Sequence, residues 1–469
     1  MMKETLEREV KLAPPGEGFV LPELGGEVDP TRVFTSTYHD SADFLLARHG
    51  ITLRHRLERG AGVWQLKLPR ATGRAELQQP GPPARPPLEL SSLLVAFLRG
   101  RELGPVARLR TRREVVRVDG AEIVDDAVSV LAGQRVTARF RELEVELVGG
   151  DEQTLRRLVK ELRGAGAITA AELRPKLYRA LDLPSPAAAA EIPKKTPPDA
   201  ALGLAMAEQA RQLLAHDPGV RLGSDPEDLH EFRVATRRLR AFLRAGRPLL
   251  EPSWSEPLRD ELRWLGGALG PARDLDVLIE RIEEDVAGIG GEDAFAGLLR
   301  ALEAERVEAR RVVVEALSSD RYLALLDRLE HVGDPEPSGS GRTLRHVWRG
   351  EWKRTRKAFG RLDEGSPDDE LHAGRIRVKR ARYAAELAAH ELGKPSRPFI
   401  RAAKELQDVL GGHQDAVVAE ERIRAWAGKD VETGAPARLV EAEQERRASA
   451  RAAWPKAWDA LRKAAKRLS

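Results

Sequence analysis

Hydrophobic and charged residues follow two different patterns along this chain of 469 residues. Before residue 182, short segments alternate apolar and charged positions, as in residues 6–12, and alternation with a period of two is typical of β-strands. After residue 200, apolar residues recur every three or four positions, with Gly or Pro at the ends of most runs, which is typical of amphipathic helices. The pattern therefore predicts a β-rich N-terminal part followed by an all-α C-terminal part.

The two patterns meet in a stretch rich in proline. Residues 183–199, with the sequence LPSPAAAAEIPKKTPPD, contain five prolines, a composition typical of a stiff, extended linker. We therefore expect three parts: a β domain over residues 1–182, a linker over residues 183–199 and a helical domain over residues 200–469. A chain of this length has enough apolar material to build a core in each domain.

The charged residues of the predicted strands lie on one face of each strand and are sorted by sign. For any single strand, the solvated face of an ordinary antiparallel sheet explains such a pattern. A surface built for solubility mixes both signs locally, however, so sorting across several strands favours a closed antiparallel barrel with its charges inward. The acidic strands carry Glu7, Glu9 and Lys11 at the start and Glu142, Glu144 and Glu146 at the end; between them lie Arg54, Arg56, Lys67, Arg74, Glu76, Arg108, Arg110, Arg112 and Glu114.

The acidic strands have the composition of a site for a divalent metal ion. Glu142, Glu144 and Glu146 share one face, where they repel one another unless a cation lies among them. Hard divalent cations prefer such oxygen ligands, and Glu7 and Glu9 complete the predicted set. A wall of Arg and Lys facing a metal held by carboxylates suits a polyanion such as a triphosphate.

These residues resemble the CYTH family, also called triphosphate tunnel metalloenzymes, over residues 1–182. The resemblance rests on the E-x-E-x-K that begins at Glu7, the R-x-R that begins at Arg54 and the closing E-x-E-x-E. It implies an eight-stranded tunnel, dependence on Mg²⁺ or Mn²⁺, and hydrolysis of tripolyphosphate or an organic triphosphate. The implied catalytic residues are Glu7, Glu9 and Lys11, and the implied substrate-binding residues are Arg54, Arg56, Lys67, Arg74, Arg110, Arg112 and Lys176. The chain departs from the family pattern at residues 38–41 and 174–176.

The C-terminal part contains an internal repeat. DLHEFRVATRRLRAFL at residues 228–243 matches ELHAGRIRVKRARYAAEL at residues 370–387, with an offset of 372 − 230 = 142 between the histidines. A second pair of segments follows, beginning at Leu262 and Leu406, and aligns Asp274 with Asp415. Two pseudo-repeated helical bundles of common ancestry explain both matches.

Each copy of the repeat carries a stripe of basic residues at helical spacing. A solvated helix face accounts for one such stripe, but like charges at these spacings cost stability, and a repeated stripe is explained more simply by an anionic ligand. One histidine lies a turn before each stripe, placed to donate a hydrogen bond to phosphate rather than to bind metal. The residues are His230, Arg233, Arg237 and Arg240 in the first copy and His372, Arg375, Lys379 and Arg382 in the second.

The paired histidine helices resemble the CHAD domain, the conserved-histidine α-helical domain, over residues 200–469. The resemblance implies binding of inorganic polyphosphate by the eight residues of the two stripes, and association with polyphosphate granules. Asp274 and Asp415 are expected to brace the arginines rather than to touch the ligand.

Composition narrows the classes of protein to which this chain can belong. The absence of cysteine and of an apolar leader suits a cytoplasmic protein, and no run is apolar enough to span a membrane. A nucleic-acid binder is the weaker alternative, because 5% aromatic residues leave little for base stacking. The sequence thus predicts a polyphosphate-binding protein with a metal-dependent triphosphatase in its N-terminal tunnel. The alternative is a scaffold that binds polyphosphate without cutting it.

Overall fold

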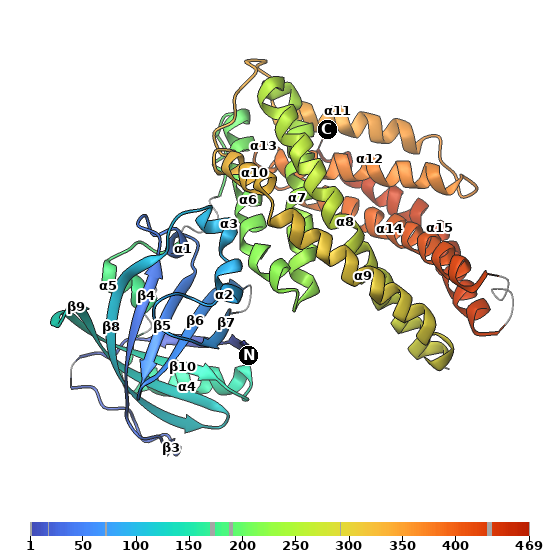
Figure 1. The fold of residues 1–469 in the computed structure, drawn as a ribbon. Coiled ribbons are helices and arrows are strands. Elements are labelled where there is room, and N and C mark those ends of the chain that lie inside the picture. The colour runs from blue at the N-terminus through green and yellow to red at the C-terminus, as the bar shows by residue number, and fades with distance from the viewer. Residues whose placement is uncertain are drawn as a thin grey trace. The chain divides into compact units, whose positions relative to one another are not determined.

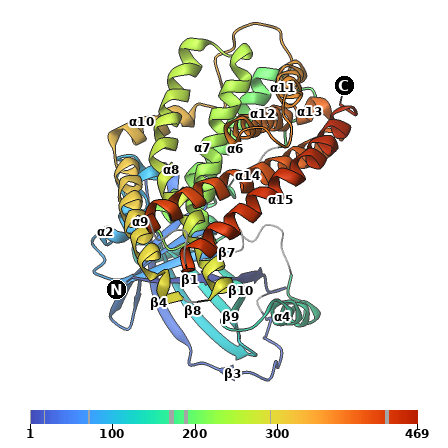
Figure 2. The same cartoon turned by 90° about the vertical axis from the view of Figure 1, so that its right-hand side faces the viewer.

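The structure is a computed structural model that describes residues 2–16, 18–70, 73–168, 174–186, 191–290, 292–428 and 434–468. The chain divides into an N-terminal unit, Met1–Ala188, and a C-terminal unit, Ala189–Ser469 (Figures 1 and 2). Residues 187–190 of the predicted linker lie outside the described residues, and its last two residues already belong to the first helix of the C-terminal unit. No helix among the described residues has the length and apolar character needed to cross a membrane.

The N-terminal unit is a nearly closed antiparallel barrel, as the sorted charges predict. Its strands follow the order β1-β7-β6-β5-β4-β8-β9-β10-β2, with the short β3 paired to β8. Counting β1 and β2 as one strand and leaving out β3, eight strands form the barrel. Their bounds are β1 (Lys3–Glu7), β2 (Glu9–Leu12), β3 (Glu27–Val28), β4 (Arg32–Asp40), β5 (Thr52–Glu58), β6 (Ala61–Arg70), β7 (Gly73–Pro80), β8 (Gly104–Val118), β9 (Ala121–Ala132) and β10 (Arg135–Leu147).

The first segment of the chain closes the barrel. β1 pairs with β7 and β2 pairs with β10, so residues on either side of Arg8 join the two edges of the sheet. The carbonyl of Arg8 accepts a hydrogen bond from the N–H of Leu147 at 3.0 Å. Closure leaves no long unpaired edge, and it brings the two acidic strands side by side.

Two helices complete the barrel. α4 (Glu152–Gly164) lies against the outside, where its buried Leu155, Leu158 and Leu162 share a core with apolar residues of β2, β9 and β10. α5 (Lys176–Leu181) closes one end, because its Leu177 and Tyr178 pack against inward-facing residues of β4, β8 and β9. We call this helix the plug.

Short helices line the rest of the barrel surface: α1 (Leu45–Arg48), α2 (Leu88–Ser92) and α3 (Val95–Leu98). Asp40, in the segment 38–41, connects β4 to α1. The carboxylate of Asp40 accepts hydrogen bonds from the backbone N–H groups of Leu46 and Ala47, both at 2.9 Å, and so fixes this helix to the end of β4.

The C-terminal unit is all α-helical, and its helices follow the same order twice. α6, α7, α8 and α9 of the first copy correspond to α11, α12, α14 and α15 of the second, and the equivalent helices α7 and α12 pack against each other. The bounds are α6 (Pro198–Leu222), α7 (Pro226–Gly246), α8 (Pro252–Ile289), α9 (Ala296–Leu317), α10 (Asp320–Glu330), α11 (Leu344–Phe359), α12 (Asp368–Leu387), α13 (Ala389–Leu392), α14 (Ser396–Ala427) and α15 (Gly434–Ala465).

The start of each repeated helix is encoded locally. Asp225 caps α7 by accepting a hydrogen bond from the N–H of Glu227 at 2.9 Å, and Pro226 occupies the first helical position, where its missing N–H costs nothing. α12 follows Pro367 and carries three acidic residues in its first turn, which complement the helix dipole. Both helices therefore begin just before their histidine, which fixes the direction of the basic stripe.

Candidate functional site

The first strand carries its charged residues into the barrel interior. Lys11 lies opposite Glu144 in the register of β2 and β10, and Glu9 lies opposite Glu146. Glu7, on β1, lies near the basic residues of β6 and β7 instead. The structure thus brings together the carboxylates that the sequence predicts, but in two groups.

The first group is built around two buried lysines. The Nζ of Lys11 donates a hydrogen bond to Glu142 Oε1 at 2.8 Å and another to Glu144, and the Nζ of Lys176 donates to the same two carboxylates at 2.9 Å each. Burial alone would lower the pKa of Lys176, but the carboxylates of Glu144, Glu142 and Asp126 raise it well above its usual value. Lys176 therefore lies inside the barrel as a permanent cation, delivered there by the plug.

Two arginines that the sequence analysis did not select complete this group. Arg113 forms a bidentate pair with the fully buried Asp126, with N–O distances of 2.8 and 2.6 Å, and lies 3.6 Å from Glu144. Arg179, on the plug, donates to Glu142 at 3.3 Å. A signal for Arg113 was present in the sequence, because it aligns by alternation with the apolar and buried positions of β8.

The second group surrounds Lys67. Its Nζ lies 2.7 and 2.6 Å from the two carboxylate oxygens of Glu7 and 3.0 Å from Glu76. Burial and a hydrogen bond with Glu76 raise the pKa of Glu7 to about 8, so the two carboxylates share a proton near neutral pH. Gln65 donates to Glu76 at 2.7 Å and accepts from Arg54 at 2.8 Å, which links the wall of arginines to this group.

The remaining predicted tunnel residues differ in their surroundings. Arg54 also donates to the hydroxyl of Tyr38 at 3.2 Å. The guanidinium of Arg56 lies 3.9 Å from the centre of the Phe34 ring, and burial together with the charge of Arg54 lowers its pKa to about 10. A cation destabilised in this way gains from a bound anion. Arg74 instead donates to the carbonyl of Gly50 at 2.6 Å, a structural contact.

Glu9 and Glu146 are the carboxylates best suited to a divalent metal ion. They lie directly opposite each other on neighbouring strands, and like charges in that position repel. Glu9 is 3.6 Å from Lys11, and Glu146 forms no ion pair with any described residue. Burial raises the pKa of Glu146, and the charge of Glu9 raises it further. Carboxylate oxygens are the donors that Mg²⁺ and Mn²⁺ prefer, so the residues fit such an ion.

The structure corrects the prediction for Arg110 and Arg112. Both side chains are exposed on the outer face of β8, and Arg112 pairs in register with Val33, which is also exposed. Their alternate neighbours point inward: Leu109 packs against the plug, and Arg113 pairs with the interior carboxylates. Residues of β8 alternate between the two faces as the sequence predicts, but the more apolar face is the buried one, because Leu109 packs against the plug on this wall.

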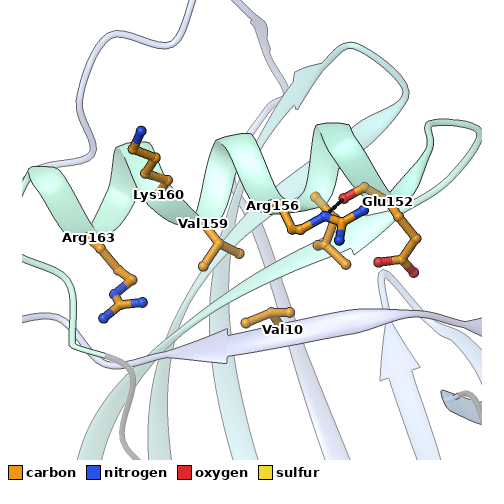
Figure 3. A pocket seen from close by; sticks show the side chains of 7 residues that line it. Val10, Glu152, Arg156, Val159, Lys160 and Arg163 are labelled. Atoms are coloured by element: carbon orange, nitrogen blue, oxygen red, sulfur yellow. Dashed lines mark hydrogen bonds between the residues drawn. The ribbon is translucent and has the colours of Figure 1, made fainter.

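A pocket of about 340 Å³ lies outside the barrel, between α4 and β2 (Figure 3). Val159 faces Val10 across its floor, and Lys160 points away from the strand. It contains none of the residues of the two interior groups, so it is separate from the candidate site.

In the C-terminal unit, basic side chains converge on a cavity of about 840 Å³ between α7, α8, α11 and α12. One acidic residue, Glu351, lies among them and is held by Arg354 at 2.8 Å. The basic lining consists of Arg237, Arg240, Arg244, Arg247, Arg259, Arg263, Arg342, His346, Arg354, Arg377, Lys379 and Arg380. Of the eight stripe residues, Arg237, Arg240 and Lys379 therefore lie in the cavity wall.

The two stripes face each other where α7 crosses α12. Arg237 donates from its Nε to the hydroxyl of Tyr383 at 2.9 Å. Burial and the charges of Arg375, Arg237, Arg382 and Arg233 together lower the pKa of Lys379 to about 7. Cations of both copies thus repel the protonated amine of Lys379, and a bound polyanion would offset that repulsion.

The other five stripe residues lie outside the cavity lining. Arg233 donates to Asp274 at 2.7 Å, as expected of a bracing carboxylate, and the charge of Arg375 acts on Asp415. His230 lies with Glu227 and Glu231, the one group of three potential metal-binding side chains found within the described ranges. His372 belongs neither to that group nor to the lining of the basic cavity. Arg382 is buried against Tyr383 and pairs with Glu386 at 3.3 Å.

Comparison with known proteins agrees with both halves of this description. Residues 5–171 match the CYTH domain family, and residues 204–424 match the CHAD domain family. The chain is 32% identical over 449 residues to the uncharacterized protein Rv2226 of Mycobacterium tuberculosis, covering 85% of this chain and 83% of that protein. It is equally identical to the uncharacterized protein MT2285 from another strain.

Solved structures resemble one unit each. The CHAD domain from the plant Ricinus communis is 26% identical with a TM-score of 0.45, over 59% of this chain and 94% of that one. HpAC1 from Hippeastrum, an adenylyl cyclase by name with a dominant triphosphatase activity, is 17% identical with a TM-score of 0.27, over 38% of this chain and 96% of that one. The chain belongs to the family of proteins in which a CYTH domain is followed by a CHAD domain.

Proposed function

We propose that this protein binds inorganic polyphosphate through its helical unit and hydrolyses a triphosphate, with Mg²⁺ or Mn²⁺, inside its barrel. The observation that supports the barrel's role most directly is the opposition of Glu9 and Glu146 beside the basic wall of Arg54, Arg56 and Lys67. We keep the domain limits proposed from the sequence, 1–182 and 200–469 with the linker between them.

Within the barrel, the residues divide by role. Glu9 and Glu146 would hold the divalent ion, with Glu7, Glu142 and Glu144 nearby; when bound, such an ion polarises phosphoryl oxygens and a water molecule. Arg54, Arg56, Lys67 and Arg113 would neutralise the phosphates and hold the chain in line for attack. Arg110 and Arg112, on the outer face, take no part in this proposal.

Charge balance explains why metal and substrate would enter together. Most interior bases, including Lys11, Lys67 and Lys176, are already paired with interior carboxylates. A triphosphate alone would bring unbalanced negative charge into a site of low dielectric, which is costly. A divalent ion carried with it offsets that charge.

The helical unit binds differently in this proposal. Its cavity presents Arg240, Arg244 and their neighbours without matching carboxylates, so phosphates can be neutralised directly and without metal. Binding should therefore weaken steeply with salt, as counterion release requires. Association with polyphosphate granules in the cytoplasm would follow from this binding.

One observation favours a second candidate, a scaffold that binds polyphosphate without cutting it. Lys11 and Lys176 hold Glu142 and Glu144, two of the predicted metal ligands, in tight ion pairs. If these pairs persist when the substrate is bound, Glu142 and Glu144 cannot support the ion, and Glu9 and Glu146 alone hold it too weakly for turnover, while polyphosphate binding by the helical unit survives.

A phosphate-release assay separates the candidates. The full chain is incubated with tripolyphosphate, ATP, thiamine triphosphate and long polyphosphate, with Mg²⁺, Mn²⁺ or EDTA. The proposal expects release with metal only, and its loss in Glu9→Gln. Glu114→Gln, the same change on the outer face of β8, is the matched control and should keep wild-type turnover. Polyphosphate binding without any release favours the scaffold, and unchanged release by Glu9→Gln contradicts the assigned site.

A further inference from the structure

The basic cavity of the helical unit does not obey the symmetry of the repeat. Two copies related by a pseudo-twofold axis would be expected to form two equivalent cavities, one on each side of the α7–α12 crossing. The cavity wall takes Arg237, Arg240 and Arg244 from the first copy but Arg377, Lys379 and Arg380 from the second. Arg237 and Lys379 are equivalent and both line the cavity, but the equivalents of Arg240, Arg244, Arg377 and Arg380 do not.

The repeat offset identifies the residues that would form the second cavity. Arg244 corresponds to Glu386, since 244 + 142 = 386, and Arg377 corresponds to Ala235, since 377 − 142 = 235. Where the existing cavity has the cations Arg244 and Arg377, the sequence-related positions hold an acid, Glu386, and a small buried apolar residue, Ala235. Arg240 corresponds to Arg382, which conserves its charge.

That conserved charge is neutralised on the other side. Glu386 lies 3.3 Å from Arg382 and 3.7 Å from Arg238. Arg382 exposes only 10% of its side chain and stacks near the ring of Tyr383, with 4.8 Å between guanidinium carbon and ring centre. A buried cation that already has a carboxylate and an aromatic partner has little left to offer a phosphate.

On the cavity side, the corresponding cations lack such partners. Arg244 is exposed, and neither it nor Arg240 forms an ion pair with a described residue. Burial and the neighbouring charges of Arg263 and Arg259 lower the pKa of Arg240. The two sides therefore differ in exposure and in charge balance.

We infer that the helical unit holds polyphosphate on one side of its pseudo-twofold axis only, in the cavity between α7, α8, α11 and α12, while Glu386 neutralises the sequence-related position. This inference rests on the proposed polyphosphate binding and narrows it to one surface. A chain of phosphates suits the cavity, because twelve basic residues line it, ten of them on these four helices, and each can neutralise a separate phosphate.

Two single substitutions on the same helix test the inference. Arg244→Ala removes a cation from the cavity, and Arg238→Ala removes one from the side of Glu386. Binding of long polyphosphate by the full chain is measured by calorimetry in EDTA at several salt concentrations, so that any contribution of the barrel is the same in every variant. We expect Arg244→Ala to weaken binding about tenfold, as for one charged hydrogen bond, and Arg238→Ala to change it by less than about twofold.

The salt dependence of polyphosphate binding is a second, independent measurement of the same contacts. Loss of one phosphate contact should reduce the slope of log K against log salt by about 0.7 for Arg244→Ala, with no change for Arg238→Ala. Arg377→Ala, on α12, should match Arg244→Ala and guards against a folding defect in one variant. Equal losses for Arg238→Ala and Arg244→Ala would refute the one-sided site while leaving polyphosphate binding intact. A wild-type chain that binds no polyphosphate would overturn the proposed function itself.

Discussion

Lys379 offers a quantitative test of how the basic cavity uses its charge. Burial and the charges of Arg375, Arg237, Arg382 and Arg233 lower the pKa of this amine from its usual 10.5 to about 7. Lys379 also lines the cavity. A polyanion bound there supplies the negative charge that the amine lacks, so binding should return the lysine to its protonated form.

The size of the effect follows from proton linkage. In the free protein the lysine is half protonated near pH 7, the value of its lowered pKa, whereas in the complex it stays charged. Affinity for polyphosphate should therefore fall by up to about 50-fold between about pH 7 and about pH 9, which is the ratio of the two protonated fractions. Arginine keeps its charge throughout, so Lys379→Arg should remove most of this loss.

The lowered pKa of Lys379 also predicts how the stability of the free protein changes with pH. In the unfolded chain the lysine regains its usual pKa of 10.5, so between about pH 7 and 10.5 the unfolded state binds more protons than the folded state. Stability of the free protein should therefore rise with pH across that window. The penalty of the lowered pKa is present in full below about pH 7, where the folded protein must hold the charged amine among arginines.

Calorimetry measures the proton directly. The full chain is titrated with long polyphosphate in EDTA, in pairs of buffers that differ in ionisation enthalpy, and the difference in heat reports the protons taken up. The wild type should take up close to one proton at about pH 8 and Lys379→Arg close to none. His346, on α11, also lines the cavity, so His346→Gln is the control for the other titratable group. Wild-type proton uptake by Lys379→Arg would refute the assignment.

Two further predictions concern the barrel and the link between binding and turnover. Arg113→Ala should lower the free energy of unfolding of the N-terminal unit by about 1–3 kcal/mol, because the buried Asp126 loses its bidentate partner and keeps only Lys176, at 3.0 Å. Arg110→Ala on the outer face should change it by less than about 0.5 kcal/mol. Urea unfolding checks both, and similar values would contradict the assignment of inner and outer faces. If the helical unit acts by raising the local concentration of substrate, Arg240→Glu combined with Arg377→Glu should raise KM for long polyphosphate and leave tripolyphosphate turnover unchanged. Steady-state kinetics on both substrates tests this expectation, and equal losses of activity on the two substrates would rule out that role.

The alternation of charged and apolar residues was enough to predict the barrel, because its strands each follow a period of two. It was not enough to say which face of a strand points inward. On β5 and β6 the charged face is the inner one, with Arg54 and Lys67, but on β8 the inner face is that of Leu109 and Arg113. The deciding factor is the plug, a helix from later in the chain whose packing no local pattern reveals.

The two lysines inside the barrel show a second limit. The sequence places Lys11 on the face of Glu7 and Glu9, and the family resemblance selects Lys176. Neither observation predicts that both amines meet the same pair of carboxylates, Glu142 and Glu144. Such a meeting depends on barrel closure and on the plug together, which are contacts between residues more than 100 positions apart for Lys11.

The repeat predicted two related helical bundles, and it could not predict the cavity. Seven of the twenty lining residues come from α8 and α11, and all of them except Arg263 lie outside the matched segments. A signal existed, since Arg259 and Arg263 lie four residues apart on α8, and His346 and Arg354 lie eight residues apart on α11, so each pair lies on or near one helix face. Only the fold brings these faces opposite α7 and α12.

The two units handle charge in opposite ways, and this difference is the basis of the separate roles that we propose for them. In the barrel, bases and acids are paired with each other, as with Lys67 between Glu7 and Glu76, so an anion can enter only by rearranging these pairs or by bringing its own cation. In the helical cavity, arginines face one another with one acid among them, so an anion relieves repulsion as it binds. A paired interior suits selective, metal-dependent chemistry on a short substrate, because each displaced ion pair adds to the cost of a wrong ligand. An unpaired surface suits tight retention of a long one, because every phosphate gains a cation and releases a counterion. In the function that we propose, holding and cutting therefore use different surfaces, and joining the two in one chain raises the local concentration of the polymer's end at the second surface.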